Sequence, residues 1–242
     1  MDTPPILTRV KTLLALFQNG QIPTLPNHEV HPQVPLGSRE NYLYFTLPVC
    51  INFQRSSPAM WQSALKTYQD PETNYLFFPE LSTATPPEKV RDDLLKHKLG
   101  LQPNKHTEIW LAISHTLHKH FQDDPRQVIA AADNDAGKLV QLLQVDRRSD
   151  FPYLRGPKLS NYWPFILSEY TDVQFSNSHL ISIIPDTHVI QCSVHLGLVP
   201  EGATTPQVEQ AWRELLEGSG ISPVTMHPVL WNWSRNHFKP EA

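Results

Sequence analysis

Proline is the residue that most limits what this chain can fold into. The 242 residues include 23 prolines and only nine glycines. Proline fixes its own φ angle and has no backbone N–H to donate, so it is disfavoured in helix interiors and central strands but fits the first turn of a helix. This composition predicts many short secondary-structure elements that begin at conformationally restricted residues. It also argues against the glycine-rich loops that hold phosphates.

Several prolines directly follow a residue type that caps helices. Such pairs are Ser57-Pro58, Thr85-Pro86, Asp124-Pro125 and Thr205-Pro206. A Ser, Thr or Asp side chain at the cap accepts a hydrogen bond from one of the free amides of the first turn. Each pair therefore predicts the start of a helix.

Apolar residues recur with helical spacing along most of the chain. We expect helices at about residues 6–17, 57–68, 86–97, 105–121, 125–145 (one or two), 158–170, 186–196, 206–217 and 223–237. Residues 42–53 are apolar and β-prone, and they fit a strand, a buried helix start or an irregular core segment.

The expected organisation is that of a mostly helical, all-α protein with two interleaved lobes. Residues 1–41 are expected to form an N-terminal helix followed by a proline-rich extended connector between residues 19 and 41. Residues 42–242 are expected to form the helical domain.

The charge balance excludes a strongly basic coat for nucleic acid, because the formal net charge is −4. The most basic stretch, residues 96–120, carries +3 before any histidine is protonated and can contact phosphates. The spacing of His106, His115, His118 and His120 does not put three of them on one helix face. We therefore expect no metal site there.

Several other classes of protein are disfavoured. No apolar run reaches the ~20 residues that span a bilayer, and no cleavage site follows the first amphipathic segment, so we expect a cytoplasmic protein without membrane contact. The two cysteines, Cys50 and Cys192, cannot build a four-cysteine site. The sequence lacks the G-x-S-x-G, G-x-G-x-x-G and P-loop motifs, which argues against serine hydrolases, dinucleotide enzymes and kinases.

Two segments of the second half carry a recognisable pattern. The turn Leu154–Lys158 contains one glycine and puts Lys158 into the first turn of a helix. The run Ile184–Val189 puts Asp186 at the next helix start, and Leu196–Val199 follows. These segments resemble the hairpin and the aspartate-bearing helix of the helix-hairpin-helix DNA glycosylase superfamily. The aspartate follows the lysine by 28 positions, a long gap that is similar to that of the archaeal 8-oxoguanine glycosylase branch.

The resemblance covers about residues 42–238. The run from Trp212 to Trp231 is similar to the archaeal 8-oxoguanine glycosylase branch. The region from Asn52 to Val145 also resembles queuosine-nucleotide N-glycosylases, which share the fold and hydrolyse a small nucleotide. The hairpin has one glycine where many DNA-acting members have two, and the four-cysteine cluster of some members is absent.

The resemblance implies a fold of two helical lobes around a cleft, with the helices at Lys158 and Asp186 starting close together over it. It implies an N-glycosylase that cleaves a base–sugar bond, first of all a base-excision repair glycosylase with AP-lyase activity. Two alternatives remain open: release of a base from queuosine 5′-phosphate or another modified nucleotide, and a non-catalytic nucleic-acid-binding relative. We expect a monomer that needs no cofactor and binds damaged or modified DNA, or the modified nucleotide.

Each candidate catalytic residue has two interpretations. The Asp186 carboxylate can stabilise the positive charge that develops at the anomeric carbon, or it can be an ordinary helix cap. The Lys158 amine can form a Schiff base with the sugar, or it can be a surface lysine or a phosphate contact.

Base-binding candidates follow from the need of a flipped or free base for aromatic faces. Trp61 and Trp231 occupy positions that resemble the base-pocket tryptophans of the archaeal branch, and Phe53 lies near Trp61 in sequence. His227 stands four positions before Trp231, where both resembled groups have a carboxylate. Large aromatic residues at helical spacing are also typical of a core.

Three arginines gather ahead of the hairpin helix. Arg147, Arg148 and Arg155 are candidates for holding a phosphate, because a guanidinium forms paired, charge-assisted hydrogen bonds to phosphate oxygens. A solvated loop is the alternative interpretation.

Overall fold

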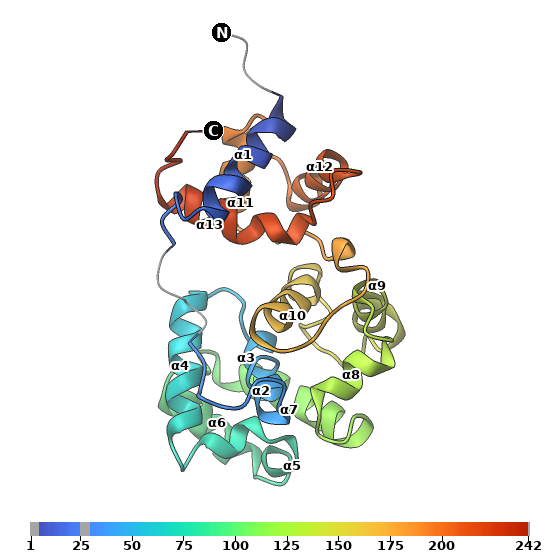
Figure 1. Ribbon diagram of the computed structural model, residues 1–242. Helices are drawn as coiled ribbons and strands as arrows, with labels where there is room; N and C mark the ends of the chain where they lie inside the picture. Colours follow the sequence, from blue (N-terminus) through green and yellow to red (C-terminus); the bar gives the residue numbers. More distant parts are fainter. Residues whose placement is uncertain (1–4, 25–29, 242) are drawn as a thin grey trace. The chain divides into compact units, whose positions relative to one another are not determined.

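The computed structural model describes residues 5–24 and 30–241. Within these residues the regular elements are all helical, and the only β-type pairing is an isolated parallel bridge between Asp135 and Ser176 (Figure 1). The prediction of an all-α fold is therefore confirmed. None of the described helices is both long and apolar enough to cross a membrane.

The chain forms two compact units. Unit 1 consists of residues 1–26 and 178–242, and unit 2 consists of residues 27–177. This differs from the division at residue 41 that we expected from the sequence, because the N-terminal helix packs with the C-terminal helices. Residues 25–29 of the expected connector lie outside the described residues.

Unit 2 is built from short helices in close succession. They are α2 (Arg39–Tyr44), α3 (Leu47–Cys50), α4 (Ser57–Gln69), η1 (Asn74–Phe77), α5 (Pro79–Ser82), α6 (Pro87–Lys96), α7 (Pro103–His120), α8 (Pro125–Ala131), α9 (Ala136–Gln141), η2 (Leu142–Asp146) and α10 (Pro157–Tyr170). The segment η2 is a single π-helical turn.

Aromatic residues fill the core of unit 2. Trp110 and Trp163 are completely buried. Each indole N–H nevertheless has an acceptor: Trp110 Nε1 donates to the Leu76 carbonyl at 2.9 Å, and Trp163 Nε1 donates to Thr46 Oγ1 at 3.0 Å. A buried tryptophan that keeps its hydrogen bond supplies apolar contact area without a desolvation penalty.

Residues 42–53 form no strand. The segment continues α2, passes through α3 and is buried at every position from Tyr42 to Ile51. A strand presents its side chains alternately to two faces, whereas this segment packs on all sides. Its β-prone composition therefore reflects burial, which is one of the possibilities that the sequence left open.

Three of the four expected caps shift by one residue. At α6 the cap position is Pro86 and not Thr85, and no side chain caps that helix. Ser56, and not Ser57, caps α4, and Thr204, and not Thr205, caps α12 (Thr205–Leu216), so the proline is the second helical residue in both. Asp124 caps α8 as expected, accepting from the Arg126 amide at 2.9 Å.

Unit 1 packs the first helix against the last ones. Its elements are α1 (Ile6–Gln18), η3 (Ser178–Leu180), α11 (Thr187–His195), α12, η4 (Pro223–Thr225) and α13 (Met226–Arg235). Val10 and Leu13 of α1 share one core with Val189 and Cys192 of α11. The amphipathic pattern at the N-terminus thus identified the helix correctly, while its partners lie almost two hundred residues further along the chain.

Candidate functional site

The hairpin of unit 2 runs from η2 through residues 147–156 into α10. Its turn closes by a hydrogen bond from the Gly156 amide to the Tyr153 carbonyl at 2.8 Å. Tyr153 adopts a left-handed φ of 63°, which is uncommon for a residue with a side chain. A Cβ atom on Gly156 would lie only 3.1 Å from the Tyr153 carbonyl oxygen. The single glycine of the hairpin therefore occupies its tightest point.

A cavity of about 560 Å³ opens where α10 begins. We call it the hairpin cavity, and it is lined by Gln144, Arg148, Pro152, Tyr153, Arg155, Gly156 and Pro157. The first turn of α10 has no side-chain cap, because Gly156 stands at the cap position. Uncapped amides and the partial positive charge of a helix start attract anions.

Two of the three candidate arginines line this cavity. Arg148 donates to the Gln144 carbonyl at 3.2 Å, and Arg155 donates to the Arg148 carbonyl at 2.9 Å. Across the residues that the structure describes, neither guanidinium pairs with a carboxylate. The arrangement leaves two positive charges available to an anion in the cavity.

Arg147 is differently placed. Its Nε donates to the Asp150 carboxylate at 2.7 Å, and its guanidinium lies 4.9 Å from the centre of the Phe121 ring. It does not line the hairpin cavity. Its charge is neutralised within the loop, and its phosphate-binding role stays a prediction.

The π-helical turn supplies a residue that the sequence did not indicate. Gln144 lies within η2, lines the cavity and donates through Nε2 to Ser160 Oγ at 2.7 Å, which ties the turn to α10. Single π turns are frequent at functional sites because they redirect side chains. No sequence signal marks such a turn, which explains why Gln144 was missed.

Lys158 is the second residue of α10 and is exposed. It directly follows Pro157, which lines the cavity. Lys158 therefore lies in the first turn of the hairpin helix, as the sequence predicts.

Asp186 caps α11 in unit 1. One of its carboxylate oxygens accepts a hydrogen bond from the Val189 amide at 2.9 Å, and the residue is half-buried. The second oxygen has no hydrogen-bond donor among the described residues. Asp186 also contributes, after burial itself, to raising the pKa of the Cys192 thiol to about 12. The helix cap thus leaves one carboxylate oxygen for other chemistry.

A second cluster joins α11 to α13. The Ser234 hydroxyl donates to Gln191 Oε1 at 3.1 Å, so His188 Nδ1, 3.1 Å from the same hydroxyl, is the donor of that pair. The His188 ring stands 5.5 Å from the half-buried ring of Trp231, nearly edge-on. The Arg235 guanidinium lies 4.7 Å from the Trp231 ring centre. Trp231 therefore packs against the helix that Asp186 begins.

The other base-binding candidates are His227 in unit 1 and Trp61 and Phe53 in unit 2. His227 is half-buried on α13, one turn before Trp231. Trp61 is completely buried in unit 2, where its Nε1 donates to Tyr162 Oη at 3.4 Å, so the structure shows no open ring face. Phe53 is half-buried and stacks on Tyr153 with ring centres 4.4 Å apart. Base stacking at these residues stays a prediction.

Lys158 belongs to unit 2 and Asp186 to unit 1. The expectation that their helices start close together over a cleft is therefore not tested and stays a prediction.

The comparisons with known proteins bear on the fold. Neither a protein-family model nor a curated protein matches the chain. Two solved structures match all of it with a TM-score of 0.61: a trapped covalent intermediate of endonuclease III with DNA, in an estranged-adenine complex, at 16% identity over 91% of that chain, and a non-covalent endonuclease III–DNA complex at 17% identity over 90%. The chain therefore has the fold of these endonuclease III structures. The resemblance seen in the sequence is thereby confirmed for the architecture.

Proposed function

We propose that this chain is a DNA glycosylase that cleaves a base–sugar bond, with a lyase step through Lys158. The observation that carries the proposal is the hairpin cavity, where an uncapped helix start and two arginines without carboxylate partners lie next to Lys158. The fold shared with endonuclease III, which was solved in complex with DNA, supports the same substrate.

The hairpin cavity would hold a phosphate of the DNA backbone. The free amides of the α10 start and the guanidinium groups of Arg148 and Arg155 are all donors, and a phosphate group presents only acceptors at its anionic oxygens. Such contacts position the strand without reading its bases.

Asp186 is the proposed electrostatic stabiliser. As the bond between C1′ and the base nitrogen breaks, positive charge develops on the sugar, and a nearby carboxylate lowers the energy of that transition state. The carboxylate oxygen that does not cap α11 is the one assigned to this role.

Lys158 is the proposed nucleophile. Its neutral amine attacks C1′, the bond to the base breaks, and the electron pair leaves with the base, which takes up a proton. The lysine nitrogen then loses a proton, the C1′–O4′ bond breaks with O4′ taking up a proton, and Lys158 is left joined to C1′ as a Schiff base. One of the similar endonuclease III structures is a trapped covalent intermediate with DNA, which is in keeping with such a step.

Borohydride trapping tests the proposal. Reduction of a Schiff base on DNA containing an abasic site or a base lesion should link the protein covalently to the strand. Lys158→Ala should abolish the adduct, and Lys119→Ala, an exposed lysine on α7, should leave it unchanged. The measurement is the yield of the adduct on a denaturing gel.

Other outcomes select the alternatives. Failure to trap, together with release of a free base from a modified mononucleotide such as queuosine 5′-phosphate, would replace the DNA substrate by a salvage nucleotide and remove the nucleophile role from Lys158. Binding of DNA without base release from any lesion tried would indicate a non-catalytic relative.

A further inference from the structure

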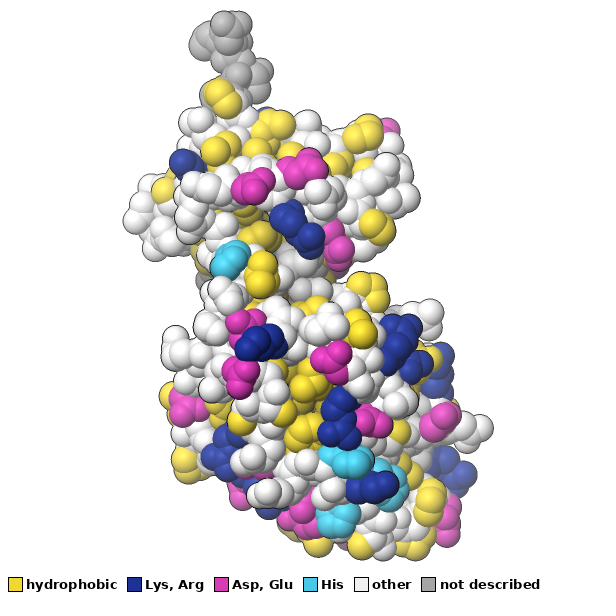
Figure 2. Space-filling model, turned by 90° about the vertical axis from the view of Figure 1, so that its right-hand side faces the viewer, with side chains coloured by type: hydrophobic (Ala, Val, Ile, Leu, Met, Phe, Trp, Pro, Cys, Tyr) yellow, Lys and Arg dark blue, Asp and Glu magenta, His cyan; other side chains and the backbone are white. Residues whose placement is uncertain are grey.

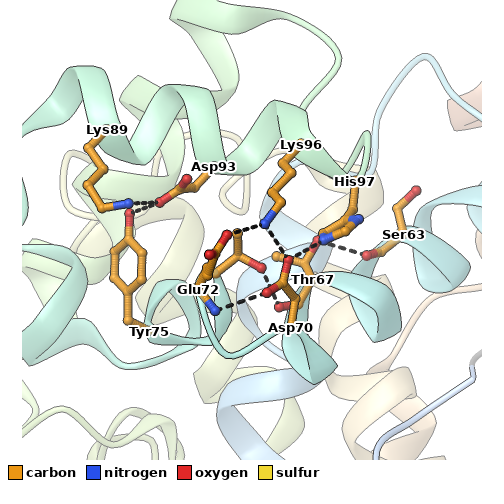
Figure 3. A network of polar contacts seen from close by, with 10 residues as sticks. Ser63, Thr67, Asp70, Glu72, Tyr75, Lys89, Asp93, Lys96 and His97 are labelled. Atoms are coloured by element: carbon orange, nitrogen blue, oxygen red, sulfur yellow. Dashed lines mark hydrogen bonds and ion pairs between the residues drawn. The ribbon is translucent and has the colours of Figure 1, made fainter.

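The basic stretch of residues 96–120 is only partly neutralised. At its beginning, Lys96 Nζ lies 2.8 Å from the Asp70 carboxylate and 2.6 Å from that of Glu72, and His97 Nε2 lies 2.6 Å from Asp70 (Figure 3). The ammonium and the imidazole hold the pKa of the Asp70 carboxyl well below its usual range. This end of the stretch has its counter-charges within the protein.

Lys105, near the start of α7, differs. Its ammonium nitrogen is 4.9 Å from the centre of the Tyr153 ring and 5.4 Å from that of Phe53. The side chain is exposed, and within the described part of the chain it has no carboxylate partner. Lys105 therefore places an unneutralised positive charge beside the tyrosine that lines the hairpin cavity.

His106 is buried next to it with an unused donor. Only 1% of the residue is exposed. Its Nδ1 accepts from the Leu101 amide at 3.1 Å, so the ring proton is on Nε2, and that atom finds no acceptor among the described residues. Burial, together with the charges of Arg55 and Lys105, lowers the pKa of the imidazole to about 4, so it is neutral at physiological pH.

Arg55 adds a second unused donor. Its two terminal nitrogens donate to the carbonyl groups of Leu99 and Lys98. Its Nε is buried and has no acceptor within the described residues. Buried N–H groups are almost always paired, with protein, water or a ligand, so two of them in one positively charged cluster point to an acceptor that comes from outside.

We propose that Arg55, Lys105 and His106 form a second phosphate site, for the backbone phosphate that neighbours the one in the hairpin cavity. Tyr153 connects the two sites, since it lines the cavity and also stacks on Phe53 beside Lys105. Phe53 also packs edge-on against His106, with ring centres 5.1 Å apart, so the same aromatic side chain contacts both Tyr153 and the buried donor. This inference rests on the proposed function, and it specifies the substrate as a polynucleotide strand, because a mononucleotide has no neighbouring phosphate.

Salt dependence tests the second site. Each phosphate contact that is lost should reduce the slope of log Kd against log salt by about 0.9 on duplex DNA. We expect this reduction for Lys105→Gln, with about tenfold weaker binding, as is ordinary for one charge-assisted hydrogen bond. Lys119→Gln, at the other end of α7, removes the same charge and should change neither quantity. Equal slopes for the two variants would overturn the second site.

Failure of the second site can be distinguished from failure of the proposed function. If Lys105→Gln matches the control while the wild-type protein still traps on DNA, the second site is wrong and the glycosylase proposal stands. If the wild-type protein binds no DNA, both are wrong. Tighter binding of a mononucleotide than of a strand would also overturn the second site.

A spectroscopic measurement reports on the buried donor directly. In the free protein, the nitrogen resonances of His106 should be those of a neutral ring protonated at Nε2. Addition of an unmodified oligonucleotide should move the Nε2–H resonance downfield, as a new hydrogen bond to a phosphate oxygen does, and should leave His115 unchanged. An unchanged His106 resonance at saturating DNA would contradict the proposal.

Discussion

The helices α10 and α11 carry the two residues on which the proposed chemistry depends, and they begin in opposite ways. At α11 the chain satisfies its own amide through the Asp186 carboxylate. At α10 a glycine stands at the cap, no side chain accepts from the first amides, and two arginines lie close by. One helix start is closed by a negative charge, and the other is open and positive.

The starts of α10 and α11 illustrate two different roles of a helix N-terminus. A helix start with a good cap gains about 1 kcal/mol of stability from it, whereas an uncapped start gives that up and becomes a place for an external anion. An uncapped helix start costs stability unless a ligand or a water molecule accepts hydrogen bonds from its free amides. Figure 2 shows basic and acidic side chains interspersed over one face of unit 2.

The largest effect is expected when the charge of Asp186 is removed while its cap is kept. Asparagine caps a helix as well as aspartate does, so Asp186→Asn should leave the free energy of unfolding within about 0.5 kcal/mol. Base release should nevertheless fall by about 100-fold or more, because the missing charge acts in the transition state. Single-turnover kinetics and chemical denaturation measure the two effects, and DNA affinity should hardly change.

Asp186→Ala is the matched variant, because it removes both the charge and the cap. It should lose the same activity and about 1 kcal/mol of stability in addition. Full activity of Asp186→Asn on every substrate would reduce Asp186 to a helix cap.

The burial of the His106 imidazole should make the protein acid-sensitive. The pKa of this histidine is about 4 in the folded protein and about 6.5 when unfolded, so the unfolded chain takes up a proton that the folded chain does not. Stability should therefore fall as the pH decreases from 6.5, by about 2 kcal/mol at pH 5. Urea denaturation at both pH values measures it, and His106→Gln should lack this step.

The open helix start predicts a salt-dependent contact. Arg155→Gln should weaken DNA binding by about tenfold and lower the salt slope by about 0.9, since it removes one phosphate contact at the hairpin. Arg147→Gln is the matched control, because the Asp150 carboxylate already neutralises that residue. Identical losses in the two variants would show that the cavity does not select between the arginines.

The smallest effect is expected at the hairpin glycine. In Gly156→Ala the new methyl group lies 3.1 Å from the Tyr153 carbonyl oxygen, so the turn has to yield by a few tenths of an ångström. We expect a loss of about 1 kcal/mol in stability and a loss of DNA affinity of a few-fold. Unchanged affinity would mean that the turn does not set the geometry of the cavity.

Local patterns were enough to predict the fold class and most of the long helices. Proline beside a capping residue predicted the start of α8 at the correct residue and the starts of α4 and α12 to within one residue. This works because capping acts within a single turn. Asp186 as the cap of α11 came from the same signal. The short helices α2 and α3 were not predicted, since burial of every residue from Tyr42 to Ile51 removes the periodicity on which such a prediction depends.

The candidate site was only partly predictable. Arg148 and Arg155 could be placed near the hairpin, but the ion pair that removes Arg147 from it depends on the folded loop. Trp61 illustrates the limit, because neither its residue type nor its spacing distinguishes a core residue from a stacking residue. Gln144, Tyr153 and the buried donors of Arg55 and His106 depend on contacts between distant segments, which no single-sequence pattern encodes.

The packing of α1 against α11 and α13 determines how early its core can form during synthesis of the chain. Residues 27–177 form their own unit and are complete before residues 178–242 are made. The core that α1 shares with α11 and α13 is therefore complete only when α13 has been synthesised, about 200 residues later, which at about 5–20 residues per second takes about 10–40 s. During translation, α1 is made well before the helices that complete its core.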